Sequence, residues 1–313
     1  MTKIPFYLNR IKTAAYEDGL GTAARETSRI VIRTVSRGFY SFYYTLNEPD
    51  IIWDGWDVCI ILDACRPDVL FELKDEYDFI SDQIPTRTSV GSTSTEWIDS
   101  TFDAEYDGYI TETAYITGNP FSDNYSELNR LALLDEVWRY AWNADYGTQP
   151  PRPLTDRAIT IWREKSPKRM IVHYMQPHFP SIPDPLSSGM ELDTFGEEWP
   201  DRVWDQLETG ELSVDRVRKA YLTNCRYVLD EVELLLDNLD APRVVITADH
   251  GNAFGEWGHY GHPEGALLPA LRRVPWVETT GTDKRTHTPD TYTRDEQTAT
   301  TVTDRLSALG YRE

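Results

Sequence analysis

The chain has 313 residues, of which 40% are apolar and 12% aromatic, with 52 acidic side chains against 31 basic ones. This composition excludes a disordered protein, and the length allows one large α/β domain or two small domains. The formal net charge of −21 disfavours nucleic acid as a partner, and anionic lipid as a general one, because their phosphates would be repelled.

The distribution of charge has a second implication. Arginine far outnumbers lysine, and the excess acid is spread along the whole chain instead of being collected in a tail. This pattern resembles that of proteins from salt-in halophiles, whose carboxylates stay hydrated at high ionic strength. We therefore expect a halophilic protein that folds best at high salt, and an ordinary acidic protein is the alternative.

The cysteines and the N-terminal segment point to an intracellular protein. The three cysteines form no CxxC motif and no zinc-ligand spacing, and Cys59 and Cys225 fall in apolar-periodic stretches typical of core positions. The N-terminal segment lacks the apolar run of a signal peptide, and no stretch is apolar enough to span a membrane. The expected location is the cytoplasm.

Residues 1–46 differ from the rest and predict a basic helical extension that precedes a catalytic unit over residues 47–313. Arginines recur at every fourth position, on one face of an expected helix, and apolar residues lie between them: Arg25, Arg29, Arg33, Arg37, Ile30, Val31, Ile32 and Val35. Residues 22–44 either touch a membrane surface or a partner protein, or pack on the acidic body with the arginines paired to carboxylates. The short apolar face favours packing on the body.

Three apolar runs of strand length follow, separated by helical stretches. The strands are Val58–Leu62, Arg169–Met175 and Arg243–Thr247, and the main helices begin at Pro67 and span Val214–Leu239. Strands rich in Val and Ile that alternate with helices predict an α/β fold, a mainly parallel sheet covered by helices on both faces. We further expect a surface loop over residues 183–205 and a closing helix over residues 298–309.

Polar side chains follow each of these three strands. Asp63 follows the first, His178 comes just beyond the second, and Asp249 and His250 follow the third. Ligands of an open α/β sheet bind outside the carboxyl ends of its strands, so these side chains are expected to meet there. A carboxylate in such a place can also cap the next helix, but all of them together favour a metal site.

At this point the sequence resembles a known family. The run VVITADHGNAFGEWGHYGHP (244–263) resembles the metal-binding segment of sulfatases and their relatives in the alkaline-phosphatase superfamily. HYMQPHFP (173–180) is similar to a loop in which a histidine reaches the substrate, and IILDACRPD (60–68) to the first strand with its metal-binding aspartate. The resemblance covers most of residues 55–280 and implies the alkaline-phosphatase-like fold.

The resemblance also implies roles for individual residues. Asp63, Asp249 and His250 would hold a divalent metal, which could be Zn, Mn, Mg or Ca, bound as one tight ion because Gln176 stands where a second ion would need an acid. His178 would contact the substrate or assist its leaving group. His262 would bind a second metal or the substrate's anionic oxygens. His259 is a less secure substrate contact, and Arg66 could neutralise the charge of the ester or equally form a salt bridge at a helix end.

The nucleophile is where the chain departs from sulfatases. Their C-x-P-S-R motif, whose cysteine becomes formylglycine, is absent, and the segment SVGSTSTEWIDSTF (89–102) stands at about the expected distance. Thr93 and Glu96 fit a capping box, so Thr93 should begin a helix, and it is the first candidate for the nucleophile, with Ser92 and Ser94 as alternatives. The cluster could also be only a cap.

An unmodified hydroxyl moves the expected chemistry from sulfate towards phosphate esters. The sequence therefore predicts a metal-dependent hydrolase or transferase of an anionic ester, with a glycan or lipid phosphoester as one substrate class. The alternatives are a non-catalytic binding protein on the same fold and a sulfatase that works without formylglycine.

Overall fold

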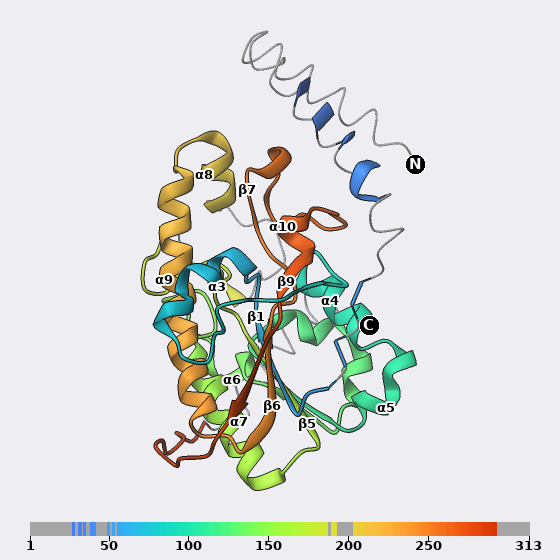
Figure 1. Cartoon of the computed structure of the whole chain (residues 1–313), viewed down its shortest axis with the longest axis vertical. Coiled ribbons are helices and arrows are strands. Elements are labelled where there is room, and N and C mark those ends of the chain that lie inside the picture. The colour runs from blue at the N-terminus through green and yellow to red at the C-terminus, as the bar shows by residue number, and fades with distance from the viewer. Residues whose placement is uncertain are drawn as a thin grey trace.

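The computed structural model describes residues 27–28, 31–32, 34–35, 38–41, 49–50, 52–53, 55–186, 189–192 and 203–292. Within these residues a six-stranded sheet forms the centre of the molecule, in the order β10-β6-β1-β5-β3-β4 (Figure 1). Five strands are parallel and β10 runs antiparallel to β6. The strands are β1 Val58–Leu62, β3 Thr113–Thr117, β4 Leu133–Glu136, β5 Arg169–Tyr174, β6 Ala241–Thr247 and β10 Val277–Gly281.

Both faces of this sheet are buried, which explains why its strands are apolar without alternation. In β1 the side chains of Val58, Ile60 and Leu62 belong to one apolar core, and those of Cys59 and Ile61 to another. The first core is covered by α3, α7 and α9, and the second by α4 and α5 together with several tryptophans. The predicted α/β fold with helices on both faces is confirmed.

The remaining elements connect or flank the sheet. Two short antiparallel ribbons pair β2 with β9 and β7 with β8. The α-helices are α3 Pro67–Leu73, α4 Ser94–Thr101, α5 Asp107–Ile110, α6 Trp138–Ala141, α7 Pro151–Lys165, α8 Val203–Thr209, α9 Val214–Leu236 and α10 Pro269–Arg272. The short strands and 3-10 helices are β2 Thr86–Thr88, β7 Ala253–Phe254, β8 Tyr260–Gly261, β9 Arg273–Pro275, η1 Lys74–Glu76, η2 Ala104–Tyr106, η3 Pro120–Asn124, η4 Ser126–Arg130 and η6 Glu256–Gly258.

The predicted elements lie close to their expected bounds. The first strand has the expected ends, the second stops one residue earlier at Tyr174, and the third begins two residues earlier at Ala241. The long helix starts at Val214, as expected, because the Ser213 side chain accepts a hydrogen bond from the Arg216 amide. It stops at Leu236, before the expected end. The last residues of the expected loop over 183–205 are helical instead, because α8 begins at Val203.

Several expectations concern residues outside the described part of the chain. They include the arginines at positions 25, 29, 33 and 37, the helix at 298–309, and most of the boundary between the extension and residues 47–313. The described pieces of 27–41 are helical and extend from the end of the body where α8, β7 and α10 lie (Figure 1), and Tyr40 packs there on the small apolar cluster of Ala253, Leu268 and Leu271. Four apolar side chains of these pieces are exposed: Val31, Ile32, Val35 and Phe39.

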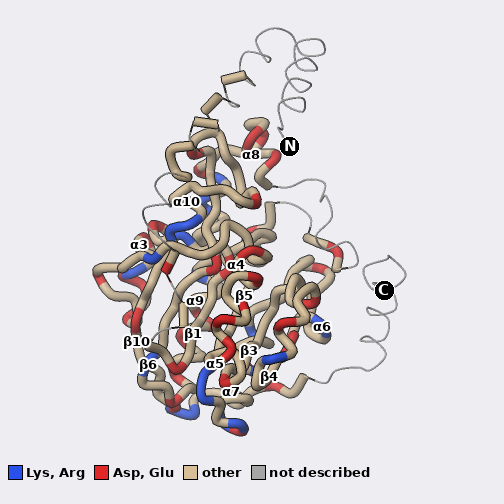
Figure 2. The backbone as a smooth tube through the Cα atoms, turned by 90° about the vertical axis from the view of Figure 1, so that its right-hand side faces the viewer, with Lys and Arg blue, Asp and Glu red and all other residues tan. Residues whose placement is uncertain are grey.

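Acidic residues are spread along the described chain, with basic ones between them (Figure 2). No helix among the described residues is long and apolar enough to cross a membrane.

Candidate active site

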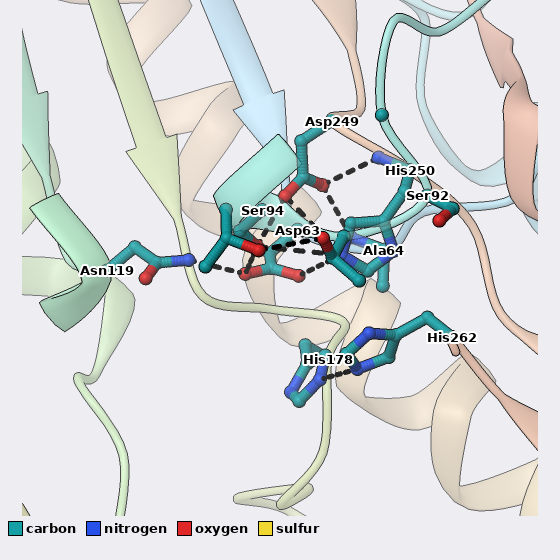
Figure 3. Close-up of polar contacts among 12 residues, drawn as sticks. Asp63, Ala64, Ser92, Ser94, Asn119, His178, Asp249, His250 and His262 are labelled. Carbon is teal, nitrogen blue, oxygen red and sulfur yellow. Dashed lines mark hydrogen bonds and ion pairs between the residues drawn. The ribbon is translucent and has the colours of Figure 1, made fainter. Parts of the chain in front are cut away.

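The candidate site lies at the carboxyl end of the parallel strands. Asp63 follows β1, Asn119 follows β3, and Asp249 and His250 follow β6. The first turn of α4 completes the site and brings Ser94 to the carboxylates (Figure 3). Folding thus brings together, at one edge of the sheet, polar side chains that are far apart in the sequence.

Ser94 is the hydroxyl that faces the two carboxylates. Its Oγ lies 2.7 Å from Asp249 Oδ2 and 3.2 Å from Asp63 Oδ2. A serine has a single hydroxyl proton, so the closer carboxylate, that of Asp249, is the better acceptor. The Nε2 of His250 also lies near the serine hydroxyl, 3.5 Å from Ser94 Oγ.

The hydroxyls of Thr93 and Ser92, the other two candidates, form hydrogen bonds at the start of α4. Thr93 is its N-cap and accepts a hydrogen bond from the Glu96 amide at 3.3 Å. Ser92 is the residue before this cap. Its backbone N–H and its hydroxyl donate hydrogen bonds to the Glu96 carboxylate, at 2.7 and 2.8 Å. The expected helix start at Thr93 is therefore confirmed, and the geometry favours Ser94 over Thr93 and Ser92 as the reactive hydroxyl, because a cap side chain turns towards its own helix. In Figure 3 Ser92 lies apart from the carboxylates, with no dashed line to either of them.

Two backbone features hold the carboxylates in place. Ala64 has a left-handed φ of 63° and donates its N–H to Asp249 Oδ1 at 3.0 Å, which links the ends of β1 and β6. A non-glycine residue with this φ costs about 1 kcal/mol or more and is typical of functional sites. A Cβ at position 251, after His250, would lie 2.3 Å from the Ala270 carbonyl oxygen, so only glycine fits there. The D-H-G sequence therefore needs its glycine for close backbone packing.

The residues present fit a divalent cation. Asp63 and Asp249 are 1% and 0% exposed, and the ion pairs described for them involve only histidines. The Oδ1 of Asp63 has no hydrogen-bond partner among the described residues. Two buried carboxylates without a lysine or arginine carry a large desolvation cost that a cation would offset.

The tautomer of His250 supports the same conclusion. Its Nδ1 lies 2.9 Å from the Gly251 carbonyl, which can only accept, so Nδ1 carries the proton. In the neutral ring Nε2 then presents a lone pair, 3.6 Å from Asp63 Oδ1 and 3.5 Å from Asp249 Oδ2. Ligands of a tetrahedral ion at roughly 2.1 Å lie about 3.4 Å apart, which matches these separations. Asp63, Asp249 and His250 are thus placed as metal ligands would be.

The pKa values of the two carboxyls move in opposite directions. Burial, and then the neighbouring charge of Asp249, raise the pKa of Asp63 well above its usual value. Burial would also raise the pKa of Asp249, but His250, His173 and the Ala64 amide outweigh it and lower that pKa. Asp249 is therefore the carboxylate that stays ionised.

His178 and His262 form a separate pair beside this cluster (Figure 3). Their Nε2 atoms are 2.8 Å apart, and the ring of His262 lies 4.6 Å from that of His250 between centroids. Burial, and then His250, lower the pKa of His178 to about 4, and burial with both neighbouring imidazoles lowers the pKa of His262. Both rings are neutral at pH 7. Since His178 Nδ1 is 2.5 Å from the Phe179 carbonyl, His262 donates the proton between the two Nε2 atoms.

For two further predicted substrate contacts, Arg66 and His259, the structure describes partners outside this cluster. The guanidinium of Arg66 binds Asp68 at 2.9 Å and Glu256 at 2.6 Å, which is the salt bridge that the sequence offered as the alternative. His259 lies between β7 and β8, where its backbone pairs with Gly255 and Glu256.

Two buried residues of the site were missed in the sequence. Asn119 donates from Nδ2 to Asp63 Oδ2 at 3.1 Å, and His173, within β5, has its Nε2 3.6 Å from Asp249 Oδ2. Asp63, His173 and Asp249 each offer one possible ligand atom, and these three atoms lie within 4.8 Å of one another. A histidine inside an apolar strand was the available signal for His173, since a buried imidazole needs partners.

Comparison with known proteins gives one family match. The Sulfatase family model matches residues 87–307, and none of the curated proteins compared with the chain matches it. The soluble domain of lipooligosaccharide phosphoethanolamine transferase A from Neisseria meningitidis is similar at 14% identity over 76% of this chain and 81% of that one, with a TM-score of 0.46.

Two further solved structures are similar at comparable levels. The C-terminal periplasmic domain of phosphoethanolamine transferase EptC from Campylobacter jejuni has 13% identity over 79% of this chain and 82% of that one, with a TM-score of 0.41. A candidate sulfatase from Bacteroides thetaiotaomicron has 12% identity over 84% and 71%, with a TM-score of 0.40. The match of the family model over most of the length decides the assignment: the chain belongs to the sulfatase family, within the alkaline-phosphatase superfamily of ester hydrolases and transferases.

Proposed function

We propose that this chain is a metal-dependent hydrolase or transferase of phosphate esters in which Ser94 is the nucleophile. The observation that carries the proposal is the position of Ser94 Oγ, 2.7 Å from Asp249 Oδ2 and 3.2 Å from Asp63 Oδ2, in the first turn of α4. A carboxylate at this distance can accept the hydroxyl proton, and a helix N-terminus favours the negative charge that develops on the oxygen.

Asp63, Asp249 and His250 would hold the ion, through two carboxylate oxygens and the unprotonated Nε2. When bound, a divalent ion lowers the pKa of a nearby hydroxyl and withdraws charge from the oxygens of the ester. This mixed set of oxygen and nitrogen donors suits Zn²⁺ or Mn²⁺ better than Ca²⁺, which prefers six or more oxygens. We propose a single ion.

In the proposed reaction, Ser94 Oγ forms a bond to phosphorus while its proton passes to Asp249. The bond between phosphorus and the ester oxygen breaks, and the departing alkoxide takes a proton from water and leaves as the alcohol. The imidazoles of His178 and His262 are both neutral, and the N–H shared between their Nε2 atoms is their proton donor nearest to the cluster, so an oxygen of the substrate would accept it in place of His178 Nε2. Water, or the alcohol of a glycan or lipid, then takes the phosphoryl group from Ser94, which makes the enzyme a hydrolase or a transferase.

Sulfate-ester cleavage is the second candidate, and the family match favours it. Against it stands the absence of the C-x-P-S-R motif and an unmodified serine in the reactive position. The ratio of aryl phosphate, aryl phosphodiester and aryl sulfate turnover separates the two. A protein that binds metal and cleaves none of them would be the non-catalytic binding protein.

The two ends of β1 supply a matched test. Asp63 follows the strand at the proposed site, while Asp57 precedes it and pairs with Arg243 at 2.6 Å. Asp63→Asn and Asp249→Ala should abolish turnover and lower the bound metal, measured by elemental analysis, and Asp57→Asn should change neither. Undiminished turnover in Asp249→Ala would contradict the proposed function.

We further propose that the N-terminal extension binds anionic membrane surfaces, which would bring a lipid ester within reach. Residues 1–46 carry seven basic and three acidic side chains, a net charge of +4, whereas the remaining chain carries −25. Val35 and Phe39 on its helical part are each 61% exposed, and Tyr40 contacts the half-exposed Trp257 beside β7 (ring centroids 6.4 Å apart). Basic amphipathic helices of this kind bind anionic lipid surfaces.

Sedimentation with lipid vesicles tests this part of the proposal. The protein should bind vesicles that contain phosphatidylglycerol and should bind pure phosphatidylcholine more weakly. Phe39→Asp should abolish binding, while Phe71→Asp, which alters an equally exposed phenylalanine on α3, should not. Equal binding of both variants would exclude the extension as the contact, and self-association that Phe39→Asp abolishes would show a second copy as its partner.

A further inference from the structure

Arg66 is a largely buried arginine between the two segments that carry the metal ligands. Along the chain it stands three residues after Asp63, and its side chain is 14% exposed. A Cβ at Gly251, the residue after His250, would lie 3.3 Å from Arg66 Cγ, so the arginine stem packs against the segment of the second carboxylate. A guanidinium in such a place is stable only when its donors find acceptors.

The acceptors lie on both sides of the short strand β7. Arg66 Nη1 donates to the carbonyl of Asn252, just before the strand, at 2.8 Å, and to Glu256 Oε1, two residues after it, at 2.6 Å. The guanidinium carbon also lies 5.1 Å from the centre of the Phe254 ring, on β7 itself. One side chain thus fixes both ends of β7 relative to the end of β1.

The position of β7 in turn sets the position of His262. The strand pairs with β8 so that Ala253 lies opposite Gly261, and His262 is the next residue along the chain. A Cβ at Gly261 would lie 2.9 Å from the Trp204 ring, so the backbone has little room on that side. The imidazole of His262 reaches His178, with 2.8 Å between the two Nε2 atoms. A shift of β7 would therefore move the N–H that this pair offers to the substrate.

A second arginine of the same ion network provides a comparison. Arg218, on α9, binds Asp68 at 3.1 Å, the carboxylate that Arg66 also binds through Nε at 2.9 Å. Its other partner is Glu72, so both carboxylates that Arg218 binds belong to α3. Both are nearly half-exposed, and ion pairs of this kind contribute about 1 kcal/mol or less each. Arg66 differs because it joins the start of α3 to β7.

We propose that Arg66 is a positioning residue for the proposed reaction: by fixing β7 it holds His262, and with it the pair to His178, where a phosphate ester at Ser94 meets their shared N–H. The inference rests on the proposed function, since it assigns how two of its residues are held. It replaces the substrate contact that the sequence offered for Arg66, because the donors of this guanidinium are directed to protein acceptors.

A double-mutant cycle with His262 tests whether Arg66 acts through this histidine. Arg66→Met keeps an apolar chain of similar reach and removes every donor. We expect kcat/KM for an aryl phosphate to fall about 10–100-fold with the bound metal unchanged, because His262 is displaced and the metal ligands are not. In a His262→Ala protein the same substitution should change kcat/KM less than about twofold, because the residue through which it acts is already absent. Full additivity of the two losses would overturn the proposal.

Arg218→Met is the matched control. It removes an arginine that shares Asp68 with Arg66 and leaves the contacts around β7 in place, so kcat/KM should stay within about twofold. Equal losses in Arg218→Met and Arg66→Met would show a general effect of broken ion pairs and contradict the proposal. Glu256→Ala breaks the contact from the side of β7 and should lower kcat/KM in the same His262-dependent way, which keeps the test decisive if Arg66→Met does not fold.

Histidine NMR on the metal-free protein gives a readout that needs neither turnover nor an ion, and the sequence contains six histidines. Arg66→Met should shift the ring resonances of His178 and His262, assigned through His178→Asn and His262→Ala, and Arg218→Met should leave them in place. Unshifted rings in Arg66→Met would overturn the proposal even in an active enzyme. Shifted rings in a protein that cleaves no ester would refute the proposed function and still support Arg66 as the residue that holds His262.

Discussion

Replacing the three neighbouring hydroxyls one at a time tests which of them reacts. Ser94→Ala removes the oxygen that lies 2.7 Å from Asp249, and with it the proposed nucleophile. We expect kcat/KM for an aryl phosphate to fall at least about 10⁴-fold, which corresponds to roughly 5.5 kcal/mol of lost transition-state stabilisation. The variant should stay folded, because it loses a single hydroxyl at a position that alanine suits in a helix.

The other two variants should affect stability more than rate. Thr93→Ala removes the N-cap bond to the Glu96 amide and should cost about 1 kcal/mol of folding free energy. Ser92→Ala removes its hydroxyl contact to Glu96 at 2.8 Å and should cost a similar amount. A loss of this size lowers the Tm by about 2–4 °C or less in a chain of this length. Both variants should keep kcat/KM within about tenfold, because their hydroxyls do not face the carboxylates.

The assay combines turnover of an aryl phosphate with thermal denaturation and metal analysis of each variant. Metal analysis is needed because loss of the ion would lower the rate for a different reason. The reasoning is refuted if Thr93→Ala, folded and loaded with metal, loses as much activity as Ser94→Ala. It is refuted equally if Ser94→Ala keeps its rate.

Three further predictions concern the surroundings of the site. Asn119→Ala removes the amide that holds Asp63 at 3.1 Å, so metal affinity measured by calorimetry should fall about tenfold or more, and an unchanged affinity would contradict the role assigned to this amide. In the metal-free protein the pKa of His178 is lowered from 6.5 to about 4, so the unfolded chain binds more protons between these values. Its free energy of unfolding, from urea titrations, should therefore drop by about 1–3 kcal/mol as the pH falls from 6.5 to 4, and His178→Asn should flatten this dependence. Gly251→Ala places a Cβ 2.3 Å from the Ala270 carbonyl oxygen and should cost about 1–3 kcal/mol, with no cost expected if that backbone contact is absent in solution.

The core of the fold was predictable because its strands are buried on both faces. A run such as Val58–Leu62 has no polar position, and a charged residue follows it directly, so both the strand and its functional end are visible in the sequence. The rule that ligands gather at the carboxyl ends of parallel strands then brings Asp63 and Asp249 together without any knowledge of strand order.

The role of a residue was not predictable from the sequence where it depends on the exact start of a helix or on which face of the sheet a side chain of a strand lies. The capping box located the start of α4 at Thr93, but a cap hydroxyl turns towards its helix, and the next side chain, that of Ser94, turns towards the sheet. Which of the two meets the carboxylates depends on where α4 sits against the strands. His173 presents the same difficulty, because its partner Tyr115 lies on a neighbouring strand, β3, that the sequence did not reveal.

Arg66 shows where proximity in the sequence misleads. It stands three residues after Asp63, yet its side chain, at the residue just before α3, forms ion pairs with Asp68 and Glu256. An acidic surface supplies many carboxylates that compete for each arginine, so an arginine near a site often forms an ion pair instead of binding the substrate.

The central claim, that Ser94 takes up the phosphoryl group, is tested most directly by trapping the covalent intermediate. The metal-loaded enzyme is mixed with an aryl phosphate, quenched with acid within the first turnover, and digested for tandem mass spectrometry. The account predicts a phosphoryl group on Ser94, absent in Ser94→Ala. A phosphoryl group on Thr93 or Ser92, or full turnover with no modified residue in the segment 89–102, would contradict it.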